Sequence, residues 1–225
     1  VATNVKVTTN DAADITSCKA TFSAGITGID GLNSPETGVK LALSADNVTS
    51  GKSCELSTVS GLLPGTTYYY AAFVKVGNGY VYGETLKLVT VIQEMEYVDM
   101  GLSVMWAKGN IGAETESEVG ALFGYGDQTG MMTSSSSNAY PSSNIAGTNE
   151  DIIYNLSLDA DSPMKSQMPT GAQMTELINN TTQEWTSVEG VEGMRFTAKN
   201  GNSIFLPAAG YRDGESAIAD AKGYY

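Results

Sequence analysis

The first half of the chain alternates between apolar and polar residues over several short runs. The clearest are "NVKVTT" (4–9), "ITSCKATFSAGI" (15–26), "TGVKLALSAD" (37–46) and "TTYYYAAFVKV" (66–76). A period of two places every second side chain on the same face, so each run predicts a strand with one buried face. Several short strands separated by turn residues predict a β-sandwich. The side chains expected on the buried faces are Val5, Val7, Cys18, Ala20, Phe22, Val39, Leu41, Leu43, Tyr68, Tyr70, Ala72, Val74 and Val76.

Two pairs of turn residues predict where the chain reverses. Asn78-Gly79 is the two-residue signal for a type I′ hairpin, which would join the strand at 66–76 to a partner at 80–90. Asn200-Gly201 gives the same signal in the second half. It would join strands expected within "GMRFTAK" and "NSIFLPA".

One helix is expected in the second half, within "MPTGAQMTELINN" (168–180). Thr170 stands at the N-cap position and Gln173 follows three residues later, which is the pattern of a capping box. An apolar stripe at helical spacing comes next, and we expect it to pack in a core rather than to hold a cofactor. The stripe consists of Met174, Leu177 and Ile178.

The charge and composition exclude several classes of function. The net charge is −13, and such a surface repels nucleic acids and anionic membranes. The chain contains no histidine, which removes the commonest general base and the commonest zinc ligand. No stretch approaches the ~20 apolar residues that span a bilayer, so no membrane insertion is expected from this sequence. Only 16% of the residues are charged, and Ser, Thr, Asn and Gly are abundant, which favours a surface protein outside the cytosol.

Cys18 and Cys54 are the two cysteines of the chain. In a sandwich of the expected type their strands are neighbours, so a cross-strand disulfide would form in an exported protein. In a regular strand Cys54 and Leu56 would point to one face and Val59 to the other. Cys54 therefore faces the same core as Val59 only if a bulge intervenes. Two partly buried thiols are therefore the favoured expectation, and the disulfide stays open as the alternative.

The string "LLPGTTY" (62–68) resembles the approach to the tyrosine corner of fibronectin type III domains. In that motif a leucine packs inward, a Pro-Gly turn reverses the chain, and a tyrosine hydroxyl ties the corner to nearby backbone. The resemblance places Tyr68 in this structural role. It implies that residues 1–91 form a fibronectin type III-like β-sandwich, a module that usually acts as a spacer.

Four strings in the second half carry a second resemblance. They are "YVDMGLSVMWAKGNIGAE" (97–114), "FGYGD" (123–127), "MPTGAQMTELI" (168–178) and "NGNSIFLPAAGYRDG" (200–214). Together they resemble the Fibrobacter major-paralogous-domain family of Bacteroidetes surface proteins. The resemblance implies that residues 92–225 form an α+β C-type-lectin-like domain, so that the whole chain is mainly β.

The same resemblance predicts how the string at 202–214 is used. The apolar residues 204–206 would form a buried core strand, and Pro207 would end its pairing. Tyr211, Arg212 and Asp213 would then emerge on a loop, where a rigid scaffold presents function. These three residues are the first candidates for ligand binding, together with Tyr125 and Tyr224.

The resemblance also bears on the end of the chain. Family members continue past a string that resembles the end of this sequence, Tyr224-Tyr225. The pattern therefore predicts a domain cut short at its C-terminus, with an unpaired strand edge at 202–207. Either the protein is longer than this chain, or a neighbouring copy or the loop at 131–150 covers the edge.

Enzymatic chemistry finds little support in the second half. Formylglycine generation, an activity of one group with this fold, needs cysteines that residues 93–225 lack. The acidic residues lie in turns, where carboxylates usually cap or face solvent, and the candidates for a glycosidase pair are Asp99, Glu114, Glu116, Glu118 and Asp127. "DADS" (159–162) has closely spaced oxygens but lacks the glycine and distal glutamate of an EF-hand loop. We expect no catalytic residue, no metal and no cofactor.

Binding is the function that the sequence favours. Aromatic side chains edged by polar groups suit sugars, although Trp106 and Trp185 are flanked by strand residues and are expected in the core. The leading interpretation is a non-enzymatic adhesion module on the surface of a Gram-negative bacterium, from which the signal peptide has been removed. A lipid anchor that has also been removed is compatible with this interpretation. Its partner would be an extracellular glycan or protein. The alternative is a structural subunit of a surface or pilus assembly, without a small ligand.

Overall fold

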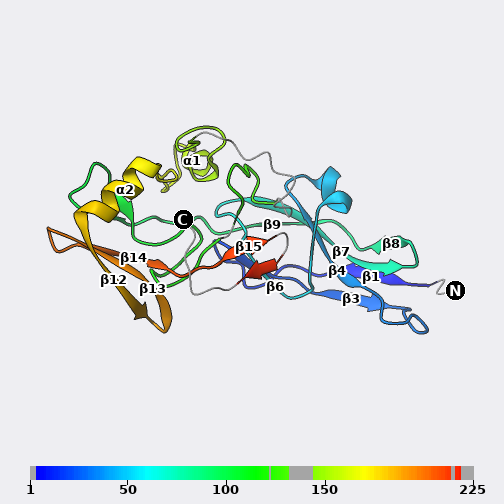
Figure 1. Cartoon of the computed structure of the whole chain (residues 1–225). Coiled ribbons are helices and arrows are strands. Elements are labelled where there is room, and N and C mark those ends of the chain that lie inside the picture. Colours follow the sequence, from blue (N-terminus) through cyan, green and yellow to red (C-terminus); the bar gives the residue numbers. More distant parts are fainter. Residues whose placement is uncertain (1–3, 122, 132–143, 214–215, 219–225) are drawn as a thin grey trace. The chain divides into compact units, whose positions relative to one another are not determined.

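The computed structural model describes residues 4–121, 123–131, 144–213 and 216–218, and of 211–213 and 216–218 it describes the backbone alone. The chain is mainly β and divides into two compact units, Val1–Val91 and Ile92–Tyr225 (Figure 1). Each unit is built of antiparallel strands. No helix in the described ranges is long and apolar enough to cross a membrane.

The described part of unit 1 contains three antiparallel sheets. Two of them have two strands each: β1 (Lys6–Thr9) pairs with β3 (Ala24–Thr27), and β2 (Lys19–Thr21) pairs with β6 (Thr58–Ser60). The third sheet has the order β5-β4-β7-β8, and β9 also pairs with β7. The bounds of its strands are β4 Thr37–Ala42, β5 Lys52–Cys54, β7 Thr67–Val76, β8 Gly79–Tyr82 and β9 Leu86–Val89, and η1 (Ala45–Ser50) follows β4.

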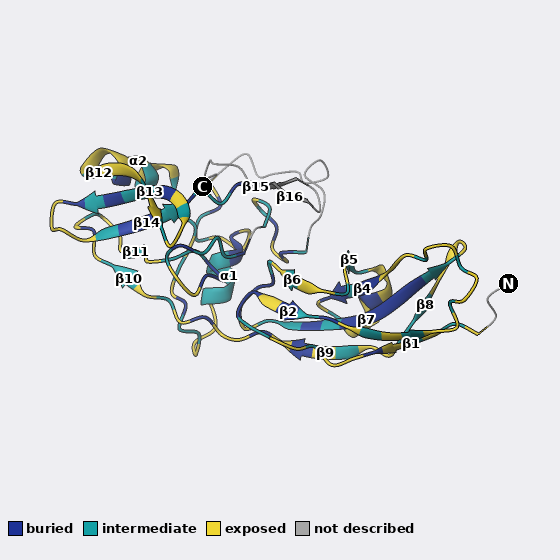
Figure 2. Ribbon diagram, turned by 90° about the horizontal axis from the view of Figure 1, so that it is seen from below, coloured by how far each residue is buried: buried dark blue, intermediate teal, exposed yellow. Residues whose placement is uncertain are grey.

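The core of unit 1 follows the predicted alternation closely. Four alternate residues of β7 are at most 1% exposed, and Figure 2 shows this strand as largely buried: they are Tyr68, Tyr70, Ala72 and Val74. Val5, Val7 and Val76 were predicted in the same core but are only partly buried. The prediction for Leu43 is wrong, because β4 ends at Ala42 and Leu43 lies beyond it with 40% of its surface exposed. The confirmed core residues are Cys18, Ala20, Phe22, Val39, Leu41, Tyr68, Tyr70, Ala72 and Val74.

The first hairpin turns one residue earlier than predicted. Val76 pairs with Gly79, so the two residues of the turn are Gly77 and Asn78. Gly77 has a φ of 62°, whereas Asn78 is not among the residues with positive φ. A two-residue turn that needs positive φ at its first position selects glycine there, and Gly77 meets that need better than Asn78.

Tyr68 makes the predicted tie to the backbone. The backbone N–H of Leu63 donates to the Tyr68 hydroxyl at 2.9 Å, and Tyr68 is 1% exposed. The bond closes the chain reversal at 62–68, since it joins the start of β7 to the residue before Pro64. Thr90 closes the same corner from the other side, because its hydroxyl donates to the carbonyl of Leu63.

Removing this hydroxyl tests how much the corner stabilises unit 1. Tyr68→Phe leaves the Leu63 N–H without its bond in a buried site, so we expect the free energy of unfolding to fall by about 1–3 kcal/mol. Chemical denaturation followed by tyrosine fluorescence measures the change. The matched control is Tyr80→Phe, because Tyr80 is 42% exposed. An equal midpoint for Tyr68→Phe and the wild type would contradict a structural role for the hydroxyl.

The cysteines lie in strands that are not neighbours. Cys54 ends β5, and it pairs with Val39 of β4. Cys18 precedes β2, whose partner is β6. The assumption that Cys54 belongs to the strand beside Cys18 is therefore wrong, since the chain bends between β5 and β6. Both residues are thiols, Cys18 buried and Cys54 partly buried.

Unit 2 is organised around a three-stranded sheet, β12-β13-β14, with two helices and a short ribbon. The strands are β12 Thr181–Val188, β13 Val191–Ala198 and β14 Ser203–Pro207. The helices are α1 Ile152–Ser157 and α2 Gly171–Asn180. The ribbon pairs β10 (Tyr97–Val98) with β11 (Trp106–Ala107), and β15 (Tyr211–Asp213) pairs with β16 (Ser216–Ile218).

The predicted capping box of α2 is confirmed. Thr170 Oγ1 accepts from the N–H of Gln173 at 3.1 Å, and Gln173 Oε1 accepts from the N–H of Thr170 at 2.8 Å. Leu177 is fully buried and packs with Met100, Phe196, Ala198 and Ile204. Ile178 was expected in the same stripe, but it is 45% exposed, because the helix buries a narrower face.

A buried carboxylate holds α1 in place. Asp151 is 0% exposed and is the N-cap of α1. Its Oδ1 accepts from the N–H groups of Ile153 and Tyr154, at 3.0 and 3.2 Å. Its Oδ2 accepts from the N–H groups of Gly147 and Met168, at 3.0 and 2.9 Å. One side chain therefore joins the helix to two loops that are distant in sequence.

Two features of unit 2 differ from the predictions. The strand β12 was not predicted, and it joins β13 through Glu189 and Gly190, both of which have positive φ (52° and 83°). Residues 211–213 were expected on a loop, but they form β15. The pairing with β16 runs from Tyr211 opposite Ile218 to Asp213 opposite Ser216.

The strand at 203–207 is a core strand, as predicted. Ile204 and Phe205 are 0% and 1% exposed, and Pro207 is the last residue of β14. In the described part of the chain β14 pairs with β13 alone. Residues 132–143 and 219–225 lie outside the description, so the expectation of an uncovered edge stays a prediction.

Candidate binding surface

The structure describes the five predicted ligand-binding residues to different extents. Tyr125 is 37% exposed, and its hydroxyl accepts from the N–H of Ile145 at 3.2 Å. The backbone of Tyr211, Arg212 and Asp213 lies in β15, but their side chains are not described. Tyr224 lies outside the described residues. A joint site formed by these residues therefore stays a prediction.

Four of the five acidic residues considered for catalysis have structural partners: Asp99, Glu116, Glu118 and Asp127. Asp99 Oδ1 accepts from the N–H of Gly101, and Glu118 Oε2 accepts from the N–H of Glu114. Asp127 is 1% exposed, and its Oδ1 accepts from the N–H groups of Thr129 and Gly130. These carboxylates close turns, which explains their positions without chemistry. Within the described ranges no three His, Cys, Asp or Glu side chains gather as a metal site.

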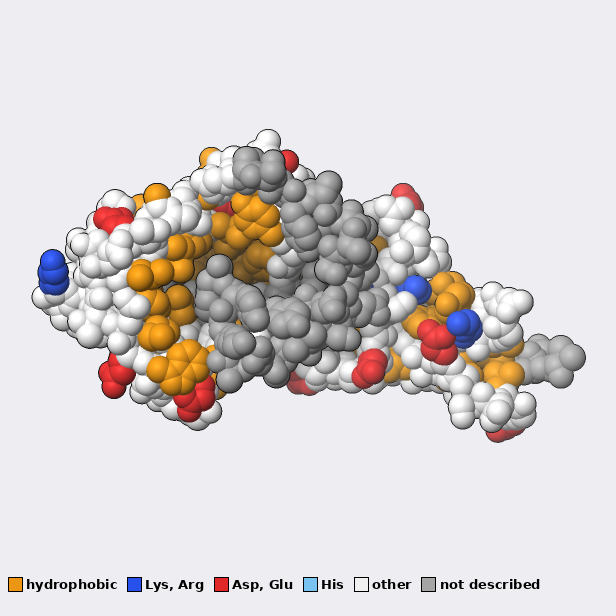
Figure 3. Space-filling model, in the orientation of Figure 1, with side chains coloured by type: hydrophobic (Ala, Val, Ile, Leu, Met, Phe, Trp, Pro, Cys, Tyr) orange, Lys and Arg blue, Asp and Glu red, His pale blue; other side chains and the backbone are white. Residues whose placement is uncertain are grey.

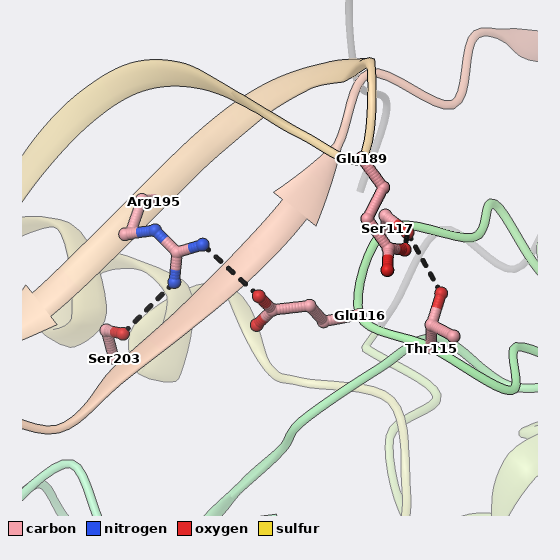
Figure 4. Close-up of polar contacts among 6 residues, drawn as sticks. All are labelled: Thr115, Glu116, Ser117, Glu189, Arg195 and Ser203. Atoms are coloured by element: carbon pink, nitrogen blue, oxygen red, sulfur yellow. Dashed lines mark hydrogen bonds and ion pairs between the residues drawn. The ribbon is translucent and has the colours of Figure 1, made fainter.

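A polar cluster joins one face of the sheet to the loop at 115–117 (Figure 4). Arg195 of β13 donates to Glu116 Oε1 at 3.2 Å and to Ser203 Oγ at 3.2 Å, and its guanidinium lies 5.6 Å from the ring centroid of Phe205. The Ser117 hydroxyl donates to Glu189 Oε2 at 2.5 Å. This bond holds Glu189, a non-glycine residue with positive φ, at the turn between β12 and β13.

This cluster attaches the loop to the sheet and leaves little of its polar surface open. Both members of the Arg195–Glu116 pair are about three-quarters buried, with side chains 26% and 27% exposed. The Phe205 ring beneath it is 1% exposed and lies against Gly193, where a Cβ would meet the ring at 2.4 Å. The face that carries Arg195 is therefore closed by its own contacts.

The opposite face of the same sheet carries an apolar row that reaches solvent. Trp185 of β12 pairs with Met194 of β13, and Met194 pairs with Leu206 of β14, so the three side chains form one cross-strand row. Met194 and Leu206 are partly buried against the core cluster. Trp185 is 49% exposed. The next pair along the strands, Ser187 and Glu192, is exposed and polar.

The prediction that Trp185 lies in the core is therefore wrong, whereas Trp106 does pack against the core cluster. Trp185 stands on an edge strand, which Figure 2 shows as largely exposed. Figure 3 shows hydrophobic side chains gathered in a band over the region of α2, β12 and β13. An exposed tryptophan beside other apolar side chains is a candidate for an interaction surface.

Trp106 has a different peculiarity. Its Nε1 is buried, and it has no hydrogen-bond partner in the described structure. The ring packs on the side of the cluster that holds Met100 and Ile204. Its role is in packing, since the indole N–H points at no polar group.

Comparisons with known proteins add little to these observations. No protein-family model matches the chain, and no curated protein matches it. Among solved structures, the chain is similar to the solution structure of the sensor domain of the anti-sigma factor RsgI4 in Pseudobacteroides cellulosolvens. The identity is 23% and the TM-score 0.31, over 39% of this chain and 76% of that one. A similarity this weak carries no argument about fold or function.

Proposed function

We propose that the chain is a non-enzymatic binding module of the cell surface, in which unit 1 is a fibronectin type III-like spacer and unit 2 a C-type-lectin-like head. The antiparallel sheets of unit 1 and the Tyr68 tie support the first assignment. The capped helix and the small sheet of unit 2 support the second.

The observation that carries the proposal is the exposure of Trp185. An indole ring that stands half exposed on a sheet offers a flat apolar face on which the C–H groups of a sugar stack. Ser187 and Glu192, on the same face one pair further on, offer a hydroxyl and a carboxylate to the hydroxyl groups of that sugar. The ligand that fits this surface best is a glycan.

Replacing Trp185 tests the proposal directly. We expect Trp185→Ala to lower the affinity for a glycan found on an array by about tenfold or more, because a buried aromatic anchor typically contributes over 1.4 kcal/mol. The array is screened with the full chain, and titration calorimetry measures the affinity. Leu158→Ala is the matched control, since Leu158 is 57% exposed at the end of α1.

The alternative is a structural subunit in which a second copy covers the same surface. The free edge that favours it is β12, an eight-residue strand that pairs only with β13 in the described part of the chain. Light scattering separates the two functions. Binding of a glycan by a monomer supports the lectin-like head. Self-association that Trp185→Ala abolishes, without any glycan signal, supports the structural subunit and contradicts the binding module.

A further inference from the structure

Unit 1 carries a second surface feature, on the face of β4, β7 and β8 that points away from Tyr68 and Tyr70. Its base is the ring of Phe73, which is 2% exposed although it lies on the outer face. The ring lies against Gly38, its direct partner on β4, where a Cβ would meet the ring at 2.8 Å. Glycine at this position lets the ring lie flat on the sheet, which fixes the position of whatever packs on it.

Two tyrosines and two lysines pack around this ring. Tyr80 meets Phe73 edge-on, with ring centroids 5.3 Å apart, and stacks on Tyr82 at 5.9 Å. Lys40 Nζ lies 5.7 Å from the centroids of both Phe73 and Tyr80, and Lys75 Nζ lies 5.8 Å from that of Tyr80. We call Lys40, Phe73, Lys75, Tyr80 and Tyr82 the lysine–aromatic patch. It forms because alternate residues of three neighbouring strands share one face.

The two lysines differ in their partners. Lys75 donates to Glu36 at 3.0 Å, and this bond raises the pKa of Lys75, so the ammonium group stays charged. Lys40 makes no ion pair within the described ranges, and only the two aromatic rings hold it. The cationic group of Lys40 is therefore not neutralised by a carboxylate in the described structure, and it can pair with an anionic group of a ligand. Figure 3 shows basic side chains beside hydrophobic ones on this unit.

We propose that the lysine–aromatic patch binds an acidic sugar, a pyranose that carries a carboxylate or a sulfate. Tyr80 is 42% exposed and gives the apolar C–H groups of the sugar a surface to stack on. Lys40 gives the anionic group its partner. Lys75, on the adjacent strand β7, is the direct cross-strand partner of Tyr80, and its Nζ lies 5.8 Å from the Tyr80 centroid, so the ring of a stacked sugar has two ammonium groups beside it.

The charge of the chain selects this ligand over larger anions. A nucleic acid needs several phosphate contacts. Outside the patch, the net charge of −13 repels the remaining phosphate groups. An acidic peptide presents no flat apolar ring for Tyr80. A single acidic sugar places one charge and one apolar face within the area that the patch covers. This site lies in unit 1 and is independent of the surface at Trp185.

The test is titration calorimetry on the full chain with four probes: tetragalacturonate, a sulfated galactan tetrasaccharide, neutral galactotetraose, and poly-glutamate. We expect at least one acidic sugar to bind about tenfold or more tightly than the neutral one, and its affinity to fall as salt shortens the screening length. Lys40→Gln should lower that affinity about tenfold. Lys87→Gln, which changes the net charge equally at an exposed lysine of β9, should leave it unchanged.

Variants of Tyr80 separate stacking from charge. Tyr80→Phe keeps the ring and should retain binding, whereas Tyr80→Ala should lose it. Equal affinities for acidic and neutral sugars, no binding of either acidic sugar, or equal losses in Lys40→Gln and Lys87→Gln would overturn the proposal. Poly-glutamate that binds as tightly as the sugars would identify an acidic-peptide site instead. Loss of acidic-sugar binding in Trp185→Ala but not in Lys40→Gln would assign the sugar to unit 2.

Discussion

Asp151→Asn is expected to lower the free energy of unfolding of unit 2 by about 3 kcal/mol or more. The carboxylate accepts four backbone N–H groups in a site with no exposed surface. An asparagine amide has one oxygen, and its NH₂ group would face two of these donors. Buried donors that lose a charged acceptor cost about 1–3 kcal/mol each, and partial relaxation keeps the sum below the full amount.

The matched control for Asp151→Asn is Glu150→Gln. It removes the same charge from the adjacent residue, which is exposed. Thermal unfolding followed by tryptophan fluorescence and by amide exchange of Ile153 and Tyr154 measures both variants. If the two variants unfolded at the same midpoint, Asp151 would not be the group that joins α1 to the loops at 147 and 168.

Gly193→Ala is expected to destabilise unit 2 by about 3 kcal/mol. The added Cβ would lie 2.4 Å from the carbonyl oxygen of Leu206 and 2.4 Å from the Phe205 ring. The ring could rotate, but the carbonyl belongs to the neighbouring strand, so the pairing of β13 with β14 must shift. Overpacking of this kind typically costs about 1–3 kcal/mol, and the contact with backbone places this case at the upper end.

Gly171→Ala is the comparison for this substitution. A Cβ at Gly171 meets nothing within 4 Å, and the residue begins α2. We expect a gain of about 0.5–1 kcal/mol there, because alanine restricts the unfolded chain and favours helix. Urea denaturation of both variants gives the two values. A Gly193→Ala protein as stable as the wild type would mean that β13 and β14 are less closely packed at this point.

The elements of unit 1 could be predicted well because local and tertiary preferences agree there. The alternate residues Tyr68, Tyr70, Ala72 and Val74 of β7 face the core as the pattern predicted, and the corner at Tyr68 has a local motif. The wrong predictions in unit 1 fall at positions where the backbone conformation of a single residue sets the turn or the end of a strand. The Gly77-Asn78 turn and the end of β4 before Leu43 depend on backbone conformation that neighbouring residues do not reveal.

The strand β12 shows why part of unit 2 could not be predicted. Its sequence, "TTQEWTSV", has one large apolar residue and no alternation, and most of its residues are exposed in the described structure. It is held as a strand by pairing with β13 over all eight residues, and the turn at Glu189 is supported by Ser117 from a distant loop. Contacts so distant in sequence leave no periodic signal.

The candidate surfaces were the hardest part to predict, for a related reason. A large aromatic residue such as Trp185 is expected in a core, but β12 pairs with β13 alone in the described part of the sheet, and Trp185 is exposed there. Lys40 and Tyr80 are forty residues apart and ordinary in their local sequence. Their proximity depends on the order of β4, β7 and β8 and on Gly38, which leaves room for Phe73.

The positions of the two tryptophans allow intrinsic fluorescence to report on unit 2. Both lie in unit 2. Tryptophan emission excited at the red edge of indole absorption therefore follows the folding of unit 2, because the tyrosines of unit 1 do not absorb at that wavelength. Trp106 is partly buried against the core cluster, with a buried Nε1, and should emit at shorter wavelength and be quenched less by acrylamide. Trp185 should emit at longer wavelength and be quenched. One spectrum therefore separates the loss of the core of unit 2 from occupation of its surface, without any label.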